Sequence, residues 1–124
     1  MSVEWGQAGR WVWAKQTEDA RALASAKKGR TAACRYASTL DFAVDLVAQQ
    51  CRGGLYYVDW DRQRAKQTFT LWSEDGAVLD QRLVGKLQGW CYLTWLVRGR
   101  IRITVDHEGG PNAVVSGVFL GPEE

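Results

Sequence analysis

Residues 67–84 read QTFTLWSEDGAVLDQRLV, and this stretch decides the fold class of the chain. Polar and apolar residues alternate over positions 68–71, a pattern typical of a strand with one buried face and one face toward water. The turn that follows contains Asp75 and Gly76, and a second run begins at Val78. Because an Asp-Gly pair between two such runs is a strong hairpin signal, the stretch predicts a β-hairpin.

Strand patterns recur along most of the chain. Three further stretches alternate in the same way: 40–46, 89–98 and 100–106, with Gly99 at the reversal between the last two. Two others, 55–60 and 113–120, are nearly continuous apolar runs, as expected of strands covered on both faces. Roughly eight or nine short strands with frequent turns indicate an antiparallel sandwich, a jelly roll or a barrel.

Only residues 17–28 have the features of a helix. Thr17 could cap the first turn, the Ala-rich middle favours helix, and Gly29 suits the end. A length of 124 residues is enough for one domain and short of two, and no linker or internal repeat interrupts it. We predict that residues 1–124 form a single all-β domain, an antiparallel β-sandwich of the jelly-roll type with one short helix near residues 17–28.

The composition excludes several classes of protein. The chain is 46% hydrophobic and 24% charged, so it can bury a core and is not a disordered tail. Its net charge of +2 is too balanced to predict a nucleic-acid or membrane partner. No apolar run is long enough to span a bilayer, and the first residues lack the apolar core of a signal peptide. As it stands the chain is predicted to be cytoplasmic, or extracellular if it is a module excised from a longer protein.

Metal and cofactor sites lack their usual motifs. The three cysteines, Cys34, Cys51 and Cys91, include no C-x-x-C pair, so buried thiols are favoured, with a disulfide between two strands as the alternative. Asp59 and Asp61 lie on the same side of a strand and could bind Ca²⁺ or work as an acid–base pair on a glycosidic bond. Hydrogen bonds to loop backbone are the favoured interpretation of this pair. We predict no metal-ligating residues and no cofactor, with Ca²⁺ as the alternative.

The chain also lacks a set of catalytic groups. His107 is the single histidine, it lies in a turn, and no G-x-S-x-G motif supplies a serine for it. Ser116 lies within an apolar strand, where packing favours a small residue. Gly53 and Gly54 precede a strand and not a helix, so they do not form a phosphate-binding loop. We therefore predict that the protein is not an enzyme and has no catalytic residues.

Tryptophan is unusually abundant, with seven in 124 residues. Indole rings stack on the C–H faces of sugar rings, and a mainly apolar site with a few polar groups can then select a hydroxyl pattern. Strand alternation assigns Trp60 and Trp95 to the core, with Trp13 as a further candidate. Trp72 and Trp90 share their strand faces with Thr and Tyr, so we predict exposed rings that contact a ligand.

The two remaining tryptophans, Trp5 and Trp11, lie close to the N-terminus. They could cover an open sheet edge or contact a second copy of the chain, and we predict them as interface residues. Polar groups complete the predicted ligand-binding set, which is Trp72, Trp90, Tyr92, Asp80, Arg82 and Arg102.

Several short motifs spread over about residues 11–120 resemble one known family when taken together. They are WA at 13–14, ARAL at 20–23, RTAA at 30–33, YVDWD at 57–61, the strand that begins QT at 67–68, GAVLD at 76–80, YLTW at 92–95 and GGPNAVVSGVF at 109–119. The chain is similar to the galactose-binding-like and malectin-like jelly-roll modules appended to bacterial secreted glycoside hydrolases. Such modules generally bind sugars and do not catalyse, so the resemblance implies a carbohydrate-binding role.

Two alternatives to sugar binding remain. Arg98, Arg100 and Arg102 alternate along one strand, and beside Trp90 and Tyr92 this basic stripe could bind single-stranded nucleic acid. The net charge of +2 ranks that function below the others. The second alternative is a protein-interaction or oligomerisation module. We predict a non-catalytic binding module for a glycan or another small polar ligand, with self-association as an option and no membrane partner.

Overall fold

The computed structural model describes residues 2–18, 23–24, 30–45, 51–58, 60, 66–85, 90–108 and 112–121. Most of these residues lie in antiparallel strands and none lies in a helix, so the described part of the chain contains no helix that could cross a bilayer. The strands are β1 (Ser2–Glu4), β2 (Gly9–Thr17), β3 (Leu23–Ala24), β4 (Arg30–Ala37), β5 (Leu40–Asp45), β6 (Cys51–Val58), β7 (Lys66–Trp72), β8 (Val78–Val84), β9 (Trp90–Val97), β10 (Arg100–Glu108), β11 (Ala113–Val115) and β12 (Gly117–Gly121).

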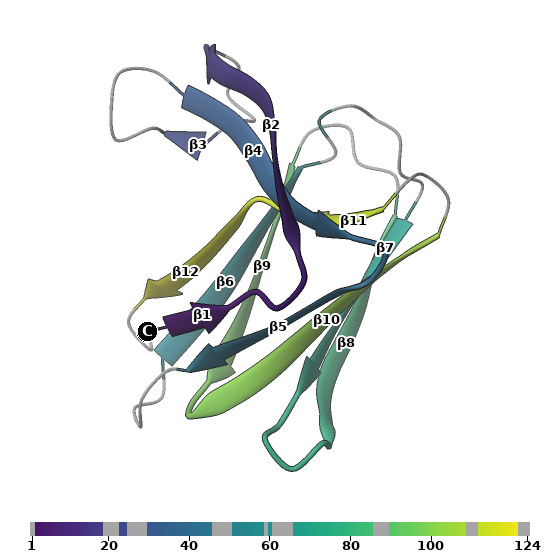
Figure 1. Ribbon diagram of the computed structural model, residues 1–124. Coiled ribbons are helices and arrows are strands. Elements are labelled where there is room, and N and C mark those ends of the chain that lie inside the picture. The colour runs from purple at the N-terminus through teal and green to yellow at the C-terminus, as the bar shows by residue number, and fades with distance from the viewer. Residues whose placement is uncertain are drawn as a thin grey trace.

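The largest sheet has five strands in the order β1-β5-β10-β7-β8 (Figure 1). Its β7–β8 hairpin is the one that residues 67–84 predict, and a hydrogen bond from the Ser73 N–H to the Ala77 carbonyl (2.8 Å) closes the turn. Asp75 accepts from the Ser73 hydroxyl and braces the same turn. Gly76 has a φ of +91°, a left-handed conformation that costs glycine little. The hairpin prediction is confirmed.

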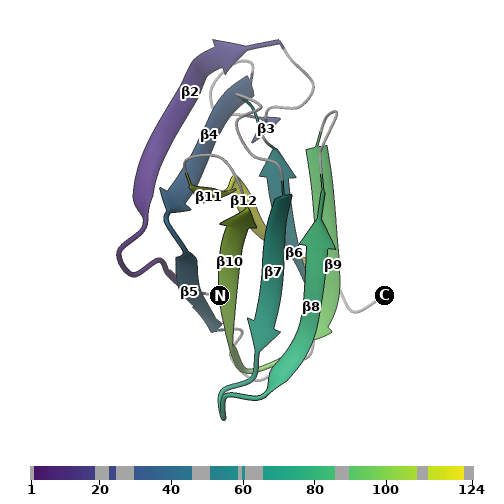
Figure 2. The ribbon, with the colours of Figure 1, turned by 90° about the vertical axis from the view of Figure 1, so that its right-hand side faces the viewer.

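A second layer is built from β12-β6-β9 and from β11-β4-β2, with β3 also paired to β4. The strands β11 and β12 are separated only by Ser116, whose N–H donates to the Tyr56 carbonyl (2.9 Å). The apolar run at 113–120 is therefore two short strands with different neighbours, because β11 pairs with β4 and β12 with β6. In Figure 2 the strands β6, β9 and β12 lie behind the five-stranded sheet.

The reversal at Gly99 joins the two layers. Gly99 has a φ of +72°, and the strands on either side of it do not pair with each other. Instead β9 pairs with β6, and β10 lies between β5 and β7. Both strands present an apolar face to the same core from opposite sheets, so alternation predicts each strand correctly but does not reveal its neighbours.

The core fills the space between the layers. Inward residues of β5, β7 and β10 meet those of β6 and β9 in one apolar cluster. Phe42, Tyr57 and Phe69 are among its largest buried members, and the Tyr57 and Phe69 ring centroids are 5.7 Å apart. This packing is the one expected of two sheets in a β-sandwich, and the predicted all-β, antiparallel class is confirmed.

A buried polar side chain, Gln67, links the layers. It is 0% exposed, its Nε2 donates to the Val114 carbonyl (3.0 Å), and its Oε1 accepts from the Val114 N–H (2.7 Å). Val114 lies at the centre of the three-residue strand β11 and is itself 0% exposed. The amide of Gln67 thereby takes the place of a neighbouring strand, since buried backbone groups need partners.

The helix predicted over residues 17–28 is not seen in the described residues of that segment. Thr17 ends β2, and residues 23–24 form β3, which pairs with β4. Apart from Glu18, the rest of the segment lies outside the described residues. A short Ala-rich segment is only marginally helical by itself, and pairing with an existing strand edge outweighs that propensity.

The predicted core tryptophans differ in their burial. Trp95 is 9% exposed and belongs to the core, as predicted. Trp60 follows β6 in a turn and is only half-buried, so its assignment to the core is wrong in part. Its ring stacks on that of Trp13, with centroids 6.5 Å apart, at the margin of the core.

The cysteines that the structure describes are thiols. Cys34 is buried in the core and Cys91 is half-buried, and burial raises the pKa of the Cys91 thiol. The side chain of Cys51 lies outside the described residues.

Candidate functional site

The outer face of the five-stranded sheet carries a group of polar and aromatic side chains. Alternation along β5, β7 and β10 turns Phe42, Leu71 and Ile101 into the core, so their neighbours in sequence turn outward. The antiparallel register then places Trp72 of β7 directly opposite Arg102 of β10. Both residues are ligand-binding candidates from sequence, and here they are cross-strand neighbours.

The Trp72 ring is held in place by two contacts. Its indole N–H donates to Thr104 Oγ1 at 3.0 Å, and the guanidinium carbon of Arg102 lies 5.7 Å from the ring centroid, within cation–π range. The side chain is half-buried, so part of it reaches solvent. Because the ring is already fixed, little conformational freedom is lost when a ligand stacks on it.

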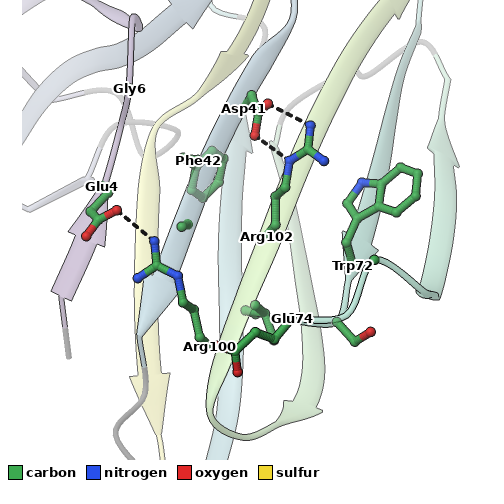
Figure 3. A pocket seen from close by; sticks show the side chains of 12 residues that line it. Glu4, Gly6, Asp41, Phe42, Trp72, Glu74, Arg100 and Arg102 are labelled. Carbon is green, nitrogen blue, oxygen red and sulfur yellow. Dashed lines mark hydrogen bonds and ion pairs between the residues drawn. The ribbon is translucent and has the colours of Figure 1, made fainter.

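Arg102 is fixed in turn by Asp41 of the neighbouring strand (Figure 3). Its Nε and Nη2 donate to the two carboxylate oxygens of Asp41, each at 2.8 Å. A bidentate pair of this kind holds the guanidinium plane in one orientation. The hydrogen bonds from Arg102 hold the pKa of Asp41 below its ordinary value, while partial burial of the carboxyl acts in the opposite direction.

A second ion pair lies on the same face. Arg100 Nη2 is 2.8 Å from Glu4 Oε2, and this hydrogen bond raises the pKa of Arg100. Arg100 and Arg102 are thus both matched by carboxylates. The basic stripe that the sequence predicts along this strand is neutralised at these two positions, which weakens its attraction for phosphate groups.

These side chains line a hollow of about 440 Å³ between β1, β5, β10 and the β7–β8 turn (Figure 3). Trp72 and Arg102 form part of its wall, Asp41 lies beside Arg102, and Glu4 lies across from them. A second hollow of about 450 Å³ adjoins it toward β9. The two hollows share four lining residues, which are Ser73, Glu74, Arg100 and Ile101.

Asp80 and Arg82, also predicted to bind ligand, face the other side of the sheet. They pair with the core residues Leu71 and Phe69, so they point toward the open edge between β8 and β9. There Asp80 Oδ2 accepts from the Trp95 indole N–H (2.6 Å) and from Arg82 Nε (2.9 Å), and the Arg82 guanidinium lies 4.5 Å from the Trp95 ring centroid. The bond from Trp95 holds the pKa of Asp80 below its ordinary value. Their side chains bridge β8 and β9, without pairing the backbone edge of β8, and do not line the hollow.

Tyr92 lies on the outer face of the opposite sheet. It is 45% exposed, and its ring meets that of Phe119 edge-on, with centroids 5.9 Å apart. Trp90 begins β9, but its side chain lies outside the described residues. Of the described candidates, Trp72 and Arg102 are the two that line the hollow.

The two tryptophans predicted as interface residues lie in different environments. Trp5 is half-buried, packs on Phe42 with centroids 4.6 Å apart, and has the Arg35 guanidinium 5.2 Å from its ring. Trp11, on β2, is 56% exposed. Trp5 therefore covers the core, whereas Trp11 stays accessible, and an interface through either residue remains a prediction.

Three acidic residues of the hollow escape the sequence patterns. Asp41 reads as an ordinary solvent-facing position of an alternating strand, and Glu4 and Glu74 read as parts of a terminus and a turn. Their place in the hollow depends on strand pairing. The register places Asp41 within reach of Arg102, and β1, which carries Glu4, lies beside β5. The alternating polar position of Asp41 is the one signal that could have marked it.

The described residues contain no group of three His, Cys, Asp or Glu side chains that could hold a metal ion. The pair considered for Ca²⁺, Asp59 and Asp61, lies outside those residues. His107 is half-buried at the end of β10, and the buried Ser116 hydroxyl makes no hydrogen bond in the described structure.

The Asp41–Arg102 pair is expected to persist down to about pH 4 and to be lost below it. In the folded state the pKa of Asp41 lies below its ordinary value of 3.8. The pair therefore stabilises the fold fully above pH 3.8, and this stabilisation disappears as the pH falls through the lowered pKa of Asp41. The Arg102 Nε–H resonance, followed by NMR between pH 7 and 2, should move only in this acid range. Asp41→Asn should abolish the transition, and a midpoint above about pH 5 would contradict the assignment.

Sequence comparisons identify no relative. No protein-family model matches the chain, and no curated protein matches it. Among solved structures, TmCBM61 in complex with β-1,4-galactotriose is similar with a TM-score of 0.51 at 16% identity, over 97% of this chain and 91% of that one. The enzymatically active domain of bacteriophage CBA120 tailspike protein 4 is similar with a TM-score of 0.42 at 13% identity, over 98% of this chain and 19% of that one. The likeness to TmCBM61 shows a shared β fold.

Proposed function

We propose that this protein is a non-catalytic carbohydrate-binding module whose ligand lies on the outer face of the five-stranded sheet, over Trp72. The observation that carries the proposal is the chain of contacts from Thr104 through Trp72 and Arg102 to Asp41 at the wall of a hollow. The fold shared with TmCBM61, which is described with a bound galactotriose, supports the same ligand class.

The chemistry of this arrangement suits a sugar. An indole ring offers an apolar surface to the C–H face of a pyranose, and fixed polar groups beside it can select the hydroxyl pattern. Arg102 retains N–H groups beyond the two bound to Asp41, and the carboxylates of Asp41 and Glu4 can accept from hydroxyl groups. All of them are held before the ligand arrives, which reduces the entropy cost of binding.

The ligand is proposed to be an oligosaccharide. The two adjoining hollows share Glu74 and Arg100, so together they form an extended surface longer than one sugar ring requires. The second hollow adds the exposed side chain of Leu96 and Arg98. A β-1,4-linked galactotriose is the natural first probe, because the similar structure is described with that sugar.

The strand order supports the jelly-roll part of the proposal. The order β5-β10-β7-β8 in one layer faces β4, the successive strands β11 and β12, β6 and β9 in the other. From β4 to β11 the chain passes to the other layer at every connection except that between β7 and β8, which supports the double-sheet arrangement of a jelly roll. We propose that residues 1–124 form one such domain and that the chain binds its ligand without cleaving it.

Isothermal titration with a panel of neutral and acidic glycans, starting with β-1,4-galactotriose, tests the proposal. We expect saturable binding that changes little between low and physiological salt, because uncharged hydroxyl groups make the contacts. Absence of binding to every glycan would contradict it. Binding to single-stranded oligonucleotides that weakens steeply with salt would favour the nucleic-acid alternative instead.

A further inference from the structure

In the edge strand β8 the leucine side chains face solvent and the charged side chains face inward. Leu79 and Leu83 are 55% and 61% exposed, whereas Asp80 and Arg82 face inward. A strand with one buried face is expected to do the reverse. Within the described residues, β8 ends its sheet and pairs with β7 alone, so its second edge is open. An open strand edge flanked by exposed leucines favours pairing with a strand of another chain.

The sequence of β8 is self-complementary. Residues 78–84 read VLDQRLV, and positions equally distant from Gln81 match each other: Asp80 with Arg82, Leu79 with Leu83, and Val78 with Val84. Antiparallel pairing of two copies about Gln81 places Asp80 of each copy opposite Arg82 of the other. It likewise places each Leu79 opposite Leu83 of the other copy. Parallel pairing in register would instead oppose like charges, and a shifted antiparallel register would separate Asp80 from Arg82.

We propose that two copies of this chain associate through antiparallel pairing of their β8 strands, with the twofold axis at Gln81. Such a contact uses the same surface on both copies and closes on itself, so it produces a dimer and not a fibre. It covers the exposed leucines and supplies hydrogen-bond partners for the backbone of the open edge. The two five-stranded sheets then form one continuous sheet.

Pairing costs the charged residues one existing bond, that from the Gln81 N–H to Asp80 Oδ1, because the Gln81 backbone then bonds to the second copy. Asp80 uses Oδ2 for Trp95 and Arg82, whereas its Oδ1 accepts only the neighbouring Gln81 N–H (2.9 Å) among the contacts described. The Asp80 and Arg82 side chains are 38% and 39% exposed, so a second copy can reach them. On pairing, the Gln81 backbone meets Gln81 of the second copy, and Asp80 Oδ1 turns to Arg82 of the second copy.

The proposed dimer leaves the hollow beside Trp72 open and covers one lining residue of the second hollow, Leu79. Trp72 lies on the outer face of β7, and the hollow extends from it toward β10, β5 and β1, away from the edge of β8. A twofold axis perpendicular to the sheet places both copies of Trp72 on the same face. The pairing itself does not depend on what the site binds.

Sedimentation equilibrium over a range of protein concentrations tests the proposal. We expect the wild-type chain to dimerise, and Leu83→Lys to raise the dimer dissociation constant at least about thirtyfold, because it sets a charge against Leu79 of the second copy. The double variant Leu79→Glu with Leu83→Lys should recover dimerisation to within about tenfold, since each new charge then faces an opposite one across the axis.

A matched control separates this contact from general surface effects. Val12 on β2 is 45% exposed and lines neither hollow, so Val12→Lys adds the same charge at an exposed apolar residue away from β8 and should leave the dissociation constant within about twofold. Near-UV circular dichroism verifies that each variant is folded. A wild-type chain that stays monomeric up to about 1 mM overturns the proposal. So does a dimer that Leu83→Lys leaves intact, or that Trp11→Ala dissociates.

Discussion

Gln67→Met is expected to lower the free energy of unfolding by about 3 to 5 kcal/mol. Methionine has nearly the length and volume of glutamine, so it leaves no cavity. It cannot replace the two hydrogen bonds to Val114, whose N–H and carbonyl lie at 2.7 and 3.0 Å from the side chain. Gln67 and Val114 are both 0% exposed, so water cannot take over these bonds.

Urea unfolding monitored by circular dichroism measures this loss, with Gln81→Met as the control. Gln81 lies on the adjacent strand, is exposed, and makes one side-chain bond to Thr70 (3.0 Å). In dilute protein, its replacement should cost about 1 kcal/mol or less. If the two variants lose the same stability, the Gln67 bonds do not hold the layers together.

Gln67→Glu distinguishes the missing hydrogen bond from a general packing defect. A protonated carboxyl keeps one acceptor and one donor for Val114, whereas the ionised form has no donor and carries a buried charge. Burial therefore raises the pKa of the introduced carboxyl above its unfolded value. A raised folded-state pKa gives stability that is present at low pH and lost as the pH rises. We expect the stability of this variant, relative to wild type, to fall between about pH 4 and 7.

Alternation predicts the strands of this protein because most of them have one face in the core. The runs at 40–46 and 67–72 become β5 and β7 with small changes at their ends, and the Asp-Gly pair becomes the hairpin turn. The same rule does not tell which strands are neighbours. Gly99 marks a reversal in the sequence, yet the strands it joins lie in different sheets, because pairing depends on contacts distant along the chain.

The site is predicted only in part for the same reason. Trp72 and Arg102 are chosen from polar strand faces, and the register brings them together. Asp80 and Arg82 are chosen as polar partners of the predicted stacking rings. Here they face inward, since the buried Trp95 indole needs an acceptor at the open edge and Asp80 supplies it. A rule based on single residues cannot foresee a partner on another strand.

Trp72→Ala is expected to weaken glycan binding by about 2 kcal/mol or more, which is roughly thirtyfold or more in the dissociation constant. The substitution removes the apolar surface on which the sugar is proposed to stack and frees Arg102 from one of the two groups that hold it. The ring is half-buried on the outer face, away from the main core cluster, so the variant should remain folded. Isothermal titration with the glycan that wild type binds best measures the loss.

Trp72→Phe separates the stacking surface from the hydrogen bond that orients it. Phenylalanine keeps an aromatic face but cannot donate to Thr104, so the ring gains freedom that binding must then remove. We expect an intermediate loss of about threefold to tenfold, because one neutral hydrogen bond contributes about 1 kcal/mol. Trp11→Ala, at a tryptophan 56% exposed on another sheet, should leave affinity within about twofold. A larger effect at Trp11 than at Trp72 would move the ligand to the face of β2, whereas the order Ala, Phe, wild type at Trp72 would place the sugar over this ring.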